Sequence, residues 1–342
     1  MKAMLLRKLT DLQSCDSPLE WVEWPNPEPA HDEILIRVTV CGVCHTELDE
    51  IEGRTAPAHF PVIPGHQVVG RVRKVGNDVR GFMPGERVGV AWVHSTCGRC
   101  RFCLAGNENL CPEFAATGRD RNGGYAEFMT VPAAFAYPIP ELFTDAEAAP
   151  LLCAGAIGYR SIRLAQIEDG QNLGLAGFGA SAHLVVKLVR HRYPQVKIFV
   201  FARNEEERAF ARELGAIWAG APEQAPPEKL TAIIDTTPVW ITVVHALKNL
   251  EPGGRLVVNA IRKEDTDKPS LLQLEYSSHL WMEKEIKSVA NVSRSDVREF
   301  LSEAAKIPIR PEVEEYSLEE ANRALLDLKH RRIRGAKVLR VS

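Results

Sequence analysis

The feature that most constrains the fold is an alternation of short apolar strands and helices, which begins near residue 172. The pattern predicts strands at 172–176, 196–201, 232–235 and 255–260, separated by helices at 180–192, 205–214 and 239–250. Strands and helices that alternate in this way are typical of a parallel sheet covered by helices. We therefore expect an α/β domain in the second half of the chain.

A glycine-rich turn joins the first of these strands to the first helix. Within LGLAGFGASAHLVVKLV, residues Gly177, Gly179 and Ala182 fit the pattern G-x-G-x-x-A. The first glycine permits a tight turn, the second lets the backbone approach a pyrophosphate, and the alanine permits close packing of helix on strand. The pattern alone is weak, but its strand–turn–helix context strengthens it. We expect Gly177, Gly179, Ala180 and Ala182 to bind a dinucleotide.

The first 150 residues have a different pattern and are predicted to be mostly β. Runs of β-branched residues between Gly and Pro turns predict strands at 33–41, 67–75 and 86–91, with a short helix at 43–50. Thr144 followed by Glu147 is a capping-box pattern, which predicts a helix through Leu152 toward Leu164. Beyond residue 290 we expect helices at 294–305 and 317–329 and a strand at 336–341.

Four of the eight cysteines form one cluster with the spacing C-x2-C-x2-C-x7-C: Cys97, Cys100, Cys103 and Cys111. Four thiolates at this spacing can enclose a tetrahedral zinc, and a site with all four positions filled is structural. In a reducing compartment clustered cysteines indicate metal rather than disulfides. Four reduced cysteines in a loop are the alternative, although free thiols are rarely placed so regularly.

Three further candidate ligands, Cys44, His66 and Cys153, are far apart in the sequence. Two thiolates and one imidazole would leave one position of a tetrahedral zinc open, which is the mark of a catalytic site. The spacing alone does not establish that they converge. Taken singly, Cys153 could be a core cysteine and His66 a histidine satisfied in a turn.

Composition excludes several other classes of protein. The chain has 342 residues, 45% of them hydrophobic and 25% charged, as expected for a globular protein of two domains. No stretch reaches the roughly 18 apolar residues of a membrane span, and the charged N-terminus does not resemble a secretory signal. A net charge of −3 gives no electrostatic case for nucleic acid or an anionic membrane. We expect a cytoplasmic protein that acts on a small molecule.

Taken together, these motifs resemble those of the zinc-dependent alcohol dehydrogenases of the medium-chain dehydrogenase/reductase superfamily. The resemblance covers essentially the whole chain and rests on Cys44-His45-Thr46, Gly65-His66, the four-cysteine cluster, the LCAG around Cys153 and the glycine-rich turn. It implies that Cys44, His66 and Cys153 converge on a catalytic zinc, so that each subunit holds two zinc ions.

The resemblance also implies a domain organisation. Residues 1–153 and 290–342 would form a GroES-like, mostly β catalytic domain with a structural zinc lobe at 97–111. Residues 154–289 would form an inserted, doubly wound Rossmann domain. Family members of this length are often tetramers, so we expect a homo-oligomer, and a tetramer rather than a dimer.

Roles near the catalytic zinc follow from the same resemblance. Thr46 matches the hydroxyl that bonds the substrate oxygen, Glu47 the acid that orients the zinc-bound histidine, and Trp92 a bulky position of the substrate pocket. Near the zinc, two residues depart from the family pattern. Asp49 stands where many members have a relay histidine, so the proton relay either uses Asp49 through water or has no side chain there. Gln67 replaces an acid beside the zinc ligand, which leaves the site one charge more positive.

The choice of dinucleotide depends on the end of the second Rossmann strand, where NAD enzymes usually have an acid for the ribose 2′-hydroxyl. That position is Ala202, followed by Arg203, as in family members that prefer NADP. Arginine can pair with a 2′-phosphate, whereas the acidic run Glu205–Glu207 would repel it. The balance slightly favours NADP(H) over NAD(H).

The expected function is reversible hydride transfer between a primary or secondary alcohol and NAD(P)(H). One alternative is an aldehyde reductase of the cinnamyl or polyol type on the same scaffold. Another is a zinc-free quinone or enoyl reductase, which the presence of all seven candidate ligands disfavours. The third is a non-catalytic NADPH-binding protein, which zinc content and turnover would distinguish.

Overall fold

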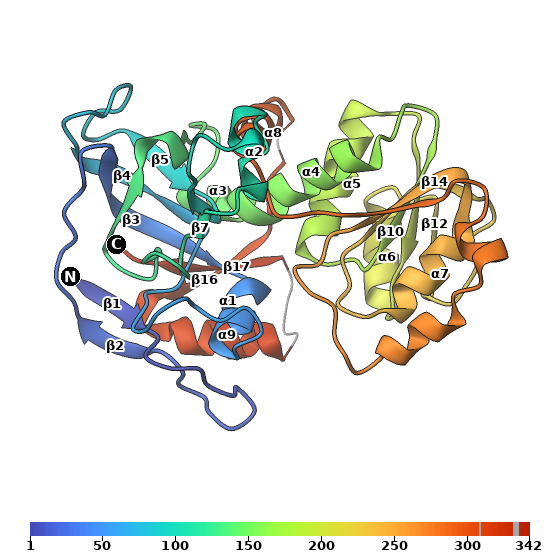
Figure 1. The fold of residues 1–342 in the computed structure, drawn as a ribbon, viewed down its shortest axis with the longest axis horizontal. Helices are drawn as coiled ribbons and strands as arrows, with labels where there is room; N and C mark the ends of the chain where they lie inside the picture. The colour runs from blue at the N-terminus through green and yellow to red at the C-terminus, as the bar shows by residue number, and fades with distance from the viewer. Residues whose placement is uncertain (308, 331–334) are drawn as a thin grey trace. The chain divides into compact units, whose positions relative to one another are not determined.

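The predicted strand–helix alternation forms a six-stranded parallel sheet in the computed structural model, which describes residues 1–307, 309–330 and 335–342. The chain divides into two units (Figure 1): unit 1 comprises Met1–Ala156 and Val292–Ser342, and unit 2 comprises Ile157–Asn291. Both chain termini therefore lie in unit 1.

Unit 2 contains the parallel sheet, with strand order β12-β11-β10-β13-β14-β15. Its elements, with the helix that leads into it, are α4 (Ala156–Ala165), β10 (Asn172–Ala176), α5 (Ala180–Arg192), β11 (Lys197–Phe201), α6 (Glu205–Glu213), β12 (Trp218–Gly220), β13 (Leu230–Asp235), α7 (Ile241–Asn249), β14 (Leu250–Val258) and β15 (Glu285–Ser288). The strand order reverses between β10 and β13, which defines the switch point at which doubly wound sheets bind ligands. The predicted doubly wound α/β architecture is confirmed.

Unit 1 is built around a mostly antiparallel sheet of seven strands, ordered β16-β17-β3-β4-β5-β9, with β8 also paired to β3. Its elements are β1 (Lys2–Leu5), β2 (Glu20–Glu23), β3 (Glu33–Val43), α1 (His45–Ile51), β4 (Val68–Val75), β5 (Arg87–Val90), β6 (Val93–Ser95), α2 (Arg101–Leu104), β7 (Ala115–Ala116), β8 (Phe128–Pro132), β9 (Ala136–Pro138), α3 (Asp145–Pro150), α8 (Arg294–Lys306), β16 (Val313–Ser317), α9 (Ala321–Lys329) and β17 (Ala336–Arg340). Because β17 pairs with β3, the C-terminal segment completes a sheet that the N-terminal segment begins.

The helix predicted from Thr144 toward Leu164 is present and contains a π-helical turn. Thr144 caps α3 as expected, with Glu147 completing the capping box, but residues Leu151–Gly155 form a π-helical turn before α4 begins. Pro150 lies at the junction, and a proline inside a helix removes a backbone donor and crowds the preceding turn. The predicted helical span is therefore confirmed, with a local change of hydrogen-bond register, and the wider turn carries Cys153.

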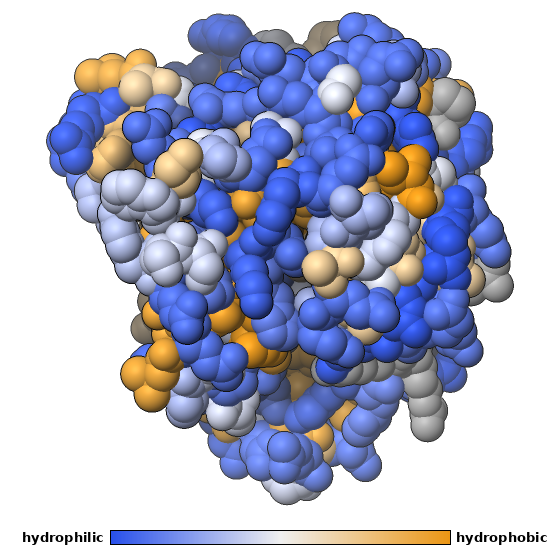
Figure 2. Space-filling model, turned by 90° about the vertical axis from the view of Figure 1, so that its right-hand side faces the viewer, coloured by the Kyte–Doolittle hydropathy of each residue, from blue (hydrophilic) through white to orange (hydrophobic). Residues whose placement is uncertain are grey.

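No helix among the described residues has the length and apolar character needed to cross a membrane. Figure 2 shows one face of the molecule, on which hydrophilic side chains predominate and hydrophobic ones form separate, small patches. The apolar residues are concentrated instead in the interior, with one core cluster in unit 1 and another in unit 2.

Candidate metal and dinucleotide sites

The four-cysteine lobe at residues 97–111 brings together the sulfurs of Cys97, Cys100, Cys103 and Cys111, all within 4.8 Å of one another. Sulfur–sulfur distances are 3.5 Å for Cys97–Cys111 and for Cys100–Cys103, and 3.9 Å for Cys97–Cys103. In a tetrahedral zinc site with bonds of 2.3 Å the sulfurs lie about 3.8 Å apart. The four cysteines are free thiols, so this donor set fits a structural zinc.

Backbone N–H groups donate to the sulfurs of the lobe and stabilise the thiolate form of its cysteines. The amides of Arg99 and Cys100 donate to the Cys97 sulfur and lower the pKa of that thiol to about 7. The Cys97 amide in turn donates to the Cys111 sulfur over 3.5 Å. Thiolate is the form that binds metal, so these contacts favour the ligating state.

The second cluster, here called the three-ligand centre, consists of Cys44, His66 and Cys153. Nε2 of His66 lies 3.6 Å from the Cys44 sulfur and 3.3 Å from the Cys153 sulfur. Nitrogen and sulfur ligands of one tetrahedral zinc lie about 3.6 Å apart. The fold thus brings together three residues that are 22 and 87 positions apart in the chain. Three ligands leave the fourth tetrahedral position open, where an oxygen could bind.

Helix α1 explains how two members of this centre are oriented. Cys44 is its N-cap, and the sulfur accepts from the Thr46 amide in the way a serine oxygen would. Glu47 completes the capping box: Oε2 accepts from the Cys44 amide at 2.9 Å, while Oε1 lies 2.5 Å from Nδ1 of His66. The same carboxylate therefore caps the helix and holds the proton on Nδ1, which turns Nε2 toward the sulfurs.

The electrostatics of the centre favour a positive charge. Burial by itself lowers the pKa of His66, but the charges of Glu47 and Cys44 outweigh burial and raise that pKa well above its ordinary value. The pKa of the Cys44 thiol is also raised, first by its contact with Cys153 and then by burial. A divalent cation supplies the charge that these groups favour, so the donor set fits zinc.

The backbone turn that leads into His66 requires a glycine at position 65. Its φ is +99°, a region that side chains rarely adopt. A Cβ there would lie 2.4 Å from the ring of Tyr125 and 2.8 Å from the Cys41 sulfur. The close packing of this turn against Tyr125 fixes the backbone that carries the imidazole.

Asp49 lies on α1, where its carboxylate pairs with Arg54 at 2.5 Å. Arg54 also contacts Glu52 at 2.5 Å, and Glu52 contacts Lys329 of α9 at 2.5 Å. The candidate relay residue therefore belongs to a chain of alternating charges. The family pattern points to Asp49 but not to this chain of charges, although Asp49, Glu52 and Arg54 lie within five positions of one another in the sequence.

Glu50 is a second acid that the sequence analysis missed. It is 1% exposed, and neither carboxylate oxygen has a hydrogen-bond partner among the described residues. Burial, followed by the charge of Glu47, raises the pKa of Glu50 well above its ordinary value. Glu50 is therefore a buried acid whose charged form is disfavoured by its surroundings.

Two further candidate residues are buried in unit 1. Trp92 is 8% exposed, and its ring lies 5.3 Å from that of Phe114 with the Arg119 guanidinium 5.2 Å away. Gln67 is 3% exposed and packs against Gly42, where a Cβ would lie 2.6 Å from its Oε1. Trp92 belongs to the apolar core cluster of unit 1 as well, so its ring has a packing role whatever else it contacts.

In unit 2 the glycine-rich turn lies between β10 and α5. Gly177 has a φ of +85°, and a Cβ there would lie 2.7 Å from Thr236 Oγ1. Gly179 is the N-cap of α5, and a Cβ on it would meet open space. Ala180 begins the helix, and Ala182 is 1% exposed. An open glycine at the N-terminus of a 13-residue helix fits a pyrophosphate, because free amides and the helix dipole favour an anion there.

At the end of β11, Ala202 is buried and its amide bonds to Gly220. Arg203 follows and is exposed. The first acid of the neighbouring run, Glu205, pairs with both Arg208 and Arg212. The repulsion expected from Glu205 is therefore reduced by two guanidinium groups of its own helix.

Comparison with known proteins adds sequence and fold relationships. The model of the family described as "Alcohol dehydrogenase GroES-like domain" matches residues 30–141, which confirms the fold class predicted for unit 1. The probable alcohol dehydrogenase AdhA of Mycobacterium tuberculosis (strain CDC 1551 / Oshkosh) is 44% identical over 327 residues, which are 94% of this chain and 92% of that protein.

Two solved structures share the whole fold. CAD from Helicobacter pylori, complexed with NADP(H), has a TM-score of 0.85 at 22% identity and covers 99% of this chain and 97% of its own. The cobalt- and zinc-bound thermostable alcohol dehydrogenase from Pyrobaculum aerophilum has a TM-score of 0.84 at 23% identity and covers 100% and 99%. At these identities the likeness concerns the fold.

Proposed function

Since the chain belongs to the zinc-dependent alcohol dehydrogenases of the medium-chain dehydrogenase/reductase superfamily, we propose that it transfers hydride reversibly between a primary or secondary alcohol and NADP(H), with two zinc ions per chain. One observation carries the proposal. Cys44, His66 and Cys153 converge within 4.8 Å and provide three ligands of suitable chemistry, with a fourth position free for a substrate oxygen.

The residues of the three-ligand centre have distinct tasks. When bound, zinc supplies Lewis acidity toward the substrate oxygen, and the dinucleotide supplies the hydride acceptor or donor. The Glu47 carboxylate accepts a hydrogen bond from Nδ1 of His66 and so keeps the proton on that nitrogen, which leaves the lone pair of Nε2 for the metal. To Thr46, on the first turn of α1, we assign the hydrogen bond to the substrate hydroxyl and the uptake of its proton.

Asp49 and Trp92 complete the proposed catalytic unit. We propose that Arg54 fixes the Asp49 carboxylate, and that the proton passes from Thr46 toward Asp49 through water. The rigid, buried ring of Trp92 supports its assignment to the substrate pocket, where it would favour flat substrates of modest size.

The dinucleotide would bind at the switch point of the unit 2 sheet. Gly177, Gly179, Ala180 and Ala182 would hold the pyrophosphate at the N-terminus of α5. Ala202 offers no carboxylate to a ribose 2′-hydroxyl, and the exposed Arg203 can pair with a 2′-phosphate. We therefore propose NADP(H) as the preferred dinucleotide.

We also propose that the protein is a cytoplasmic homo-oligomer, with a tetramer expected. The eight cysteines, all of them in unit 1, are free thiols, which suits a reducing compartment. The edge strand β15 is exposed along its length, which leaves its outer backbone groups available to a second copy.

The test combines metal content with turnover. Purified protein should contain two zinc ions per chain and should oxidise or reduce members of a small alcohol and aldehyde panel with NADPH or NADP. Cys44→Ser should retain one zinc and the fold, with kcat lowered by roughly a thousandfold. Cys15→Ser, at a partly exposed cysteine outside both clusters, is the control and should keep two zinc ions and full activity. One zinc and no turnover in the wild-type protein would refute the proposal.

A further inference from the structure

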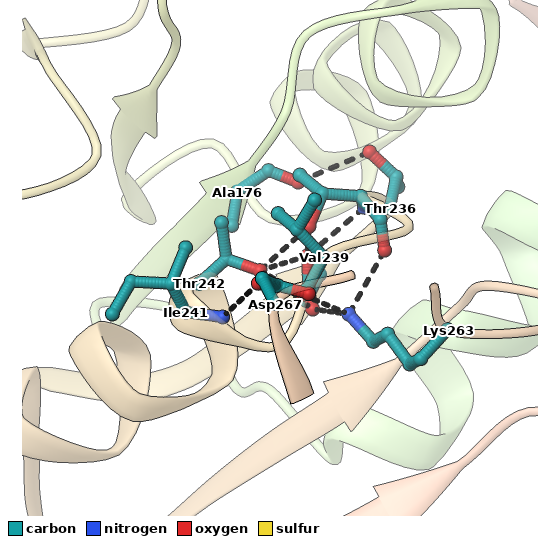
Figure 3. A network of polar contacts seen from close by, with 9 residues as sticks. Ala176, Thr236, Val239, Ile241, Thr242, Lys263 and Asp267 are labelled. Carbon is teal, nitrogen blue, oxygen red and sulfur yellow. Dashed lines mark hydrogen bonds and ion pairs between the residues drawn. The ribbon is translucent and has the colours of Figure 1, made fainter. Parts of the chain in front are cut away.

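A buried ion pair lies at the carboxyl end of the unit 2 sheet (Figure 3). β13 ends at Asp235, and Nζ of Lys263, 28 residues later, lies 2.5 Å from its Oδ2. The two side chains are 0% and 6% exposed, respectively. Desolvating two charges can outweigh their attraction, so a buried pair is weak evidence for a role in stability alone.

The contacts of Lys263 indicate what the pair does. Besides Asp235, Nζ donates to the carbonyl oxygens of Thr237 at 2.8 Å and Val239 at 3.0 Å, so all three protons of the ammonium have acceptors. Asp235 Oδ1 accepts from both the amide and the hydroxyl of Thr237, at 2.9 and 2.8 Å. Lys263 therefore ties the segment that follows β13 to the end of that strand.

This segment forms one side of the glycine-rich turn. The amide and the hydroxyl of Thr236 donate to the carbonyl of Ala176, at 2.9 and 3.0 Å. A Cβ on Gly177 would lie 2.7 Å from Thr236 Oγ1 and 3.0 Å from Thr237 Cγ2. A shift of residues 236–239 would therefore change the packing around Gly177 directly.

The position of residues 236–239 in the sheet indicates which half of a dinucleotide they would contact. β10 lies between β11 and β13, and the strand order reverses on the β13 side. A dinucleotide crosses such a switch point with its adenosine half on one side and its other half on the opposite side. Ala202 and Arg203 lie at the end of β11, so the segment held by Lys263 faces the other, nicotinamide half.

Unsatisfied polar atoms occur on the same segments. Within the described part of the chain, Trp240 Nε1, Asn259 Nδ2 and Asp267 Oδ1 are buried and have no hydrogen-bond partner. Asn259 directly follows β14, and its backbone N–H donates to the backbone carbonyl of Asp235. Buried polar groups are normally satisfied, so these atoms indicate a ligand or water in the region that Lys263 organises.

We infer that Lys263 is a positioning residue for the nicotinamide half of the dinucleotide, because its ammonium fixes residues 237–239 and, through Thr236, the wall beside Gly177. This inference rests on the proposed function, which provides the dinucleotide. The Lys263 contacts described above are all with protein groups. Lys263 therefore acts on the dinucleotide through residues 237–239, which it holds in place.

The test measures binding as well as turnover. Lys263→Met leaves the Asp235 charge unpaired, so the double variant Asp235→Asn/Lys263→Met, which removes both charges, is made beside it. Lys268→Met is the matched control, because this exposed lysine follows Lys263 closely in the chain and pairs with the exposed Asp265. Zinc content and thermal unfolding without dinucleotide verify that each variant is folded.

For the folded variants we expect Kd for NADPH to rise about tenfold, with a similar rise in KM and a smaller change in kcat. Binding of 2′,5′-ADP, which has only the adenosine half, should stay within about twofold of wild type. Unchanged NADPH binding in the double variant overturns the inference, as does an equal loss for 2′,5′-ADP, since that would indicate general loosening. A wild-type protein that binds neither NADPH nor NADH refutes the proposed function itself.

Discussion

At the scale of single residues, the end of β11 decides which dinucleotide the protein prefers. A 2′-phosphate is a multiply charged anion, and a guanidinium can meet it with two parallel hydrogen bonds. Arg203 is exposed, and Ala202 has no side chain that could bind a ribose hydroxyl. Because Glu205 is engaged by Arg208 and Arg212, the local charge near Arg203 is less negative than the run of three glutamates implies.

Replacing Arg203 by alanine should therefore weaken NADPH selectively. We expect kcat/KM for NADPH to fall by about ten- to a hundredfold, while kcat/KM for NADH stays within about twofold, because only NADPH carries the phosphate. Steady-state kinetics with both dinucleotides measure the effect. Arg192→Ala is a suitable control, since this exposed arginine ends α5 at the opposite terminus from the glycine-rich turn. Equal losses with both dinucleotides would contradict the assignment.

The sequence indicates some of these residues better than others for a physical reason. Zinc accepts few ligand types, so cysteines and histidines in a distinctive order could be selected before their distances were known. The pair Asp235–Lys263 has no such signature: lysine and aspartate are common surface residues, and only the pairing of parallel strands brings positions 28 apart into contact. Asp49 was selected, but its partner Arg54 was not.

At the scale of elements, the same sequence pattern can describe two helix geometries. Apolar spacing around residues 145–165 fits a helix, and most of the segment is helical. The π turn at Leu151–Gly155 changes the hydrogen-bond register by one residue, which apolar periodicity does not reveal. The start of α3, which has a strong end signal in the Thr144–Glu147 capping box, was located more closely.

His94 of β6 links that strand to β8 and makes unit 1 sensitive to acid. Its Nε2 donates to the Thr130 carbonyl at 3.3 Å, its Nδ1 has no partner among the described residues, and burial lowers its pKa to about 4. A histidine that the fold keeps neutral stabilises the protein above the ordinary pKa near 6.5. That stabilisation is lost as the pH falls from 6.5 toward 4, because the unfolded chain binds the proton more tightly.

His94→Gln should therefore reduce the acid sensitivity. Between pH 7.5 and 5.5 the wild-type protein should lose about 1 kcal/mol more unfolding free energy than the variant, since glutamine can donate to Thr130 without titrating. Denaturant titrations at the two pH values, with zinc content monitored, give the difference. His59→Gln, at an exposed histidine of unit 1, should behave like wild type. Parallel pH dependence in all three proteins would exclude His94 as the source.

At the scale of the whole molecule, the question is how many copies associate. Unit 2 has its own core, and its sheet ends in β15, all four residues of which are exposed. Large apolar side chains lie in or shortly before this strand: Ile286 is 49% exposed, Trp281 55% and Tyr276 66%. An unpaired edge strand with apolar neighbours is suited to pairing with a second copy across a two-fold axis.

We expect the protein to elute as a homo-oligomer, and Ile286→Lys to shift it toward a smaller species. A lysine placed at this position faces its symmetry mate or another apolar side chain, and either arrangement disfavours association. Light scattering coupled to size-exclusion chromatography gives the mass of each form. Met83→Lys, at a similarly exposed apolar residue of unit 1, tests whether any added surface charge has the same effect. If both variants keep the wild-type mass, or the wild type is a monomer, β15 is not an interface between copies.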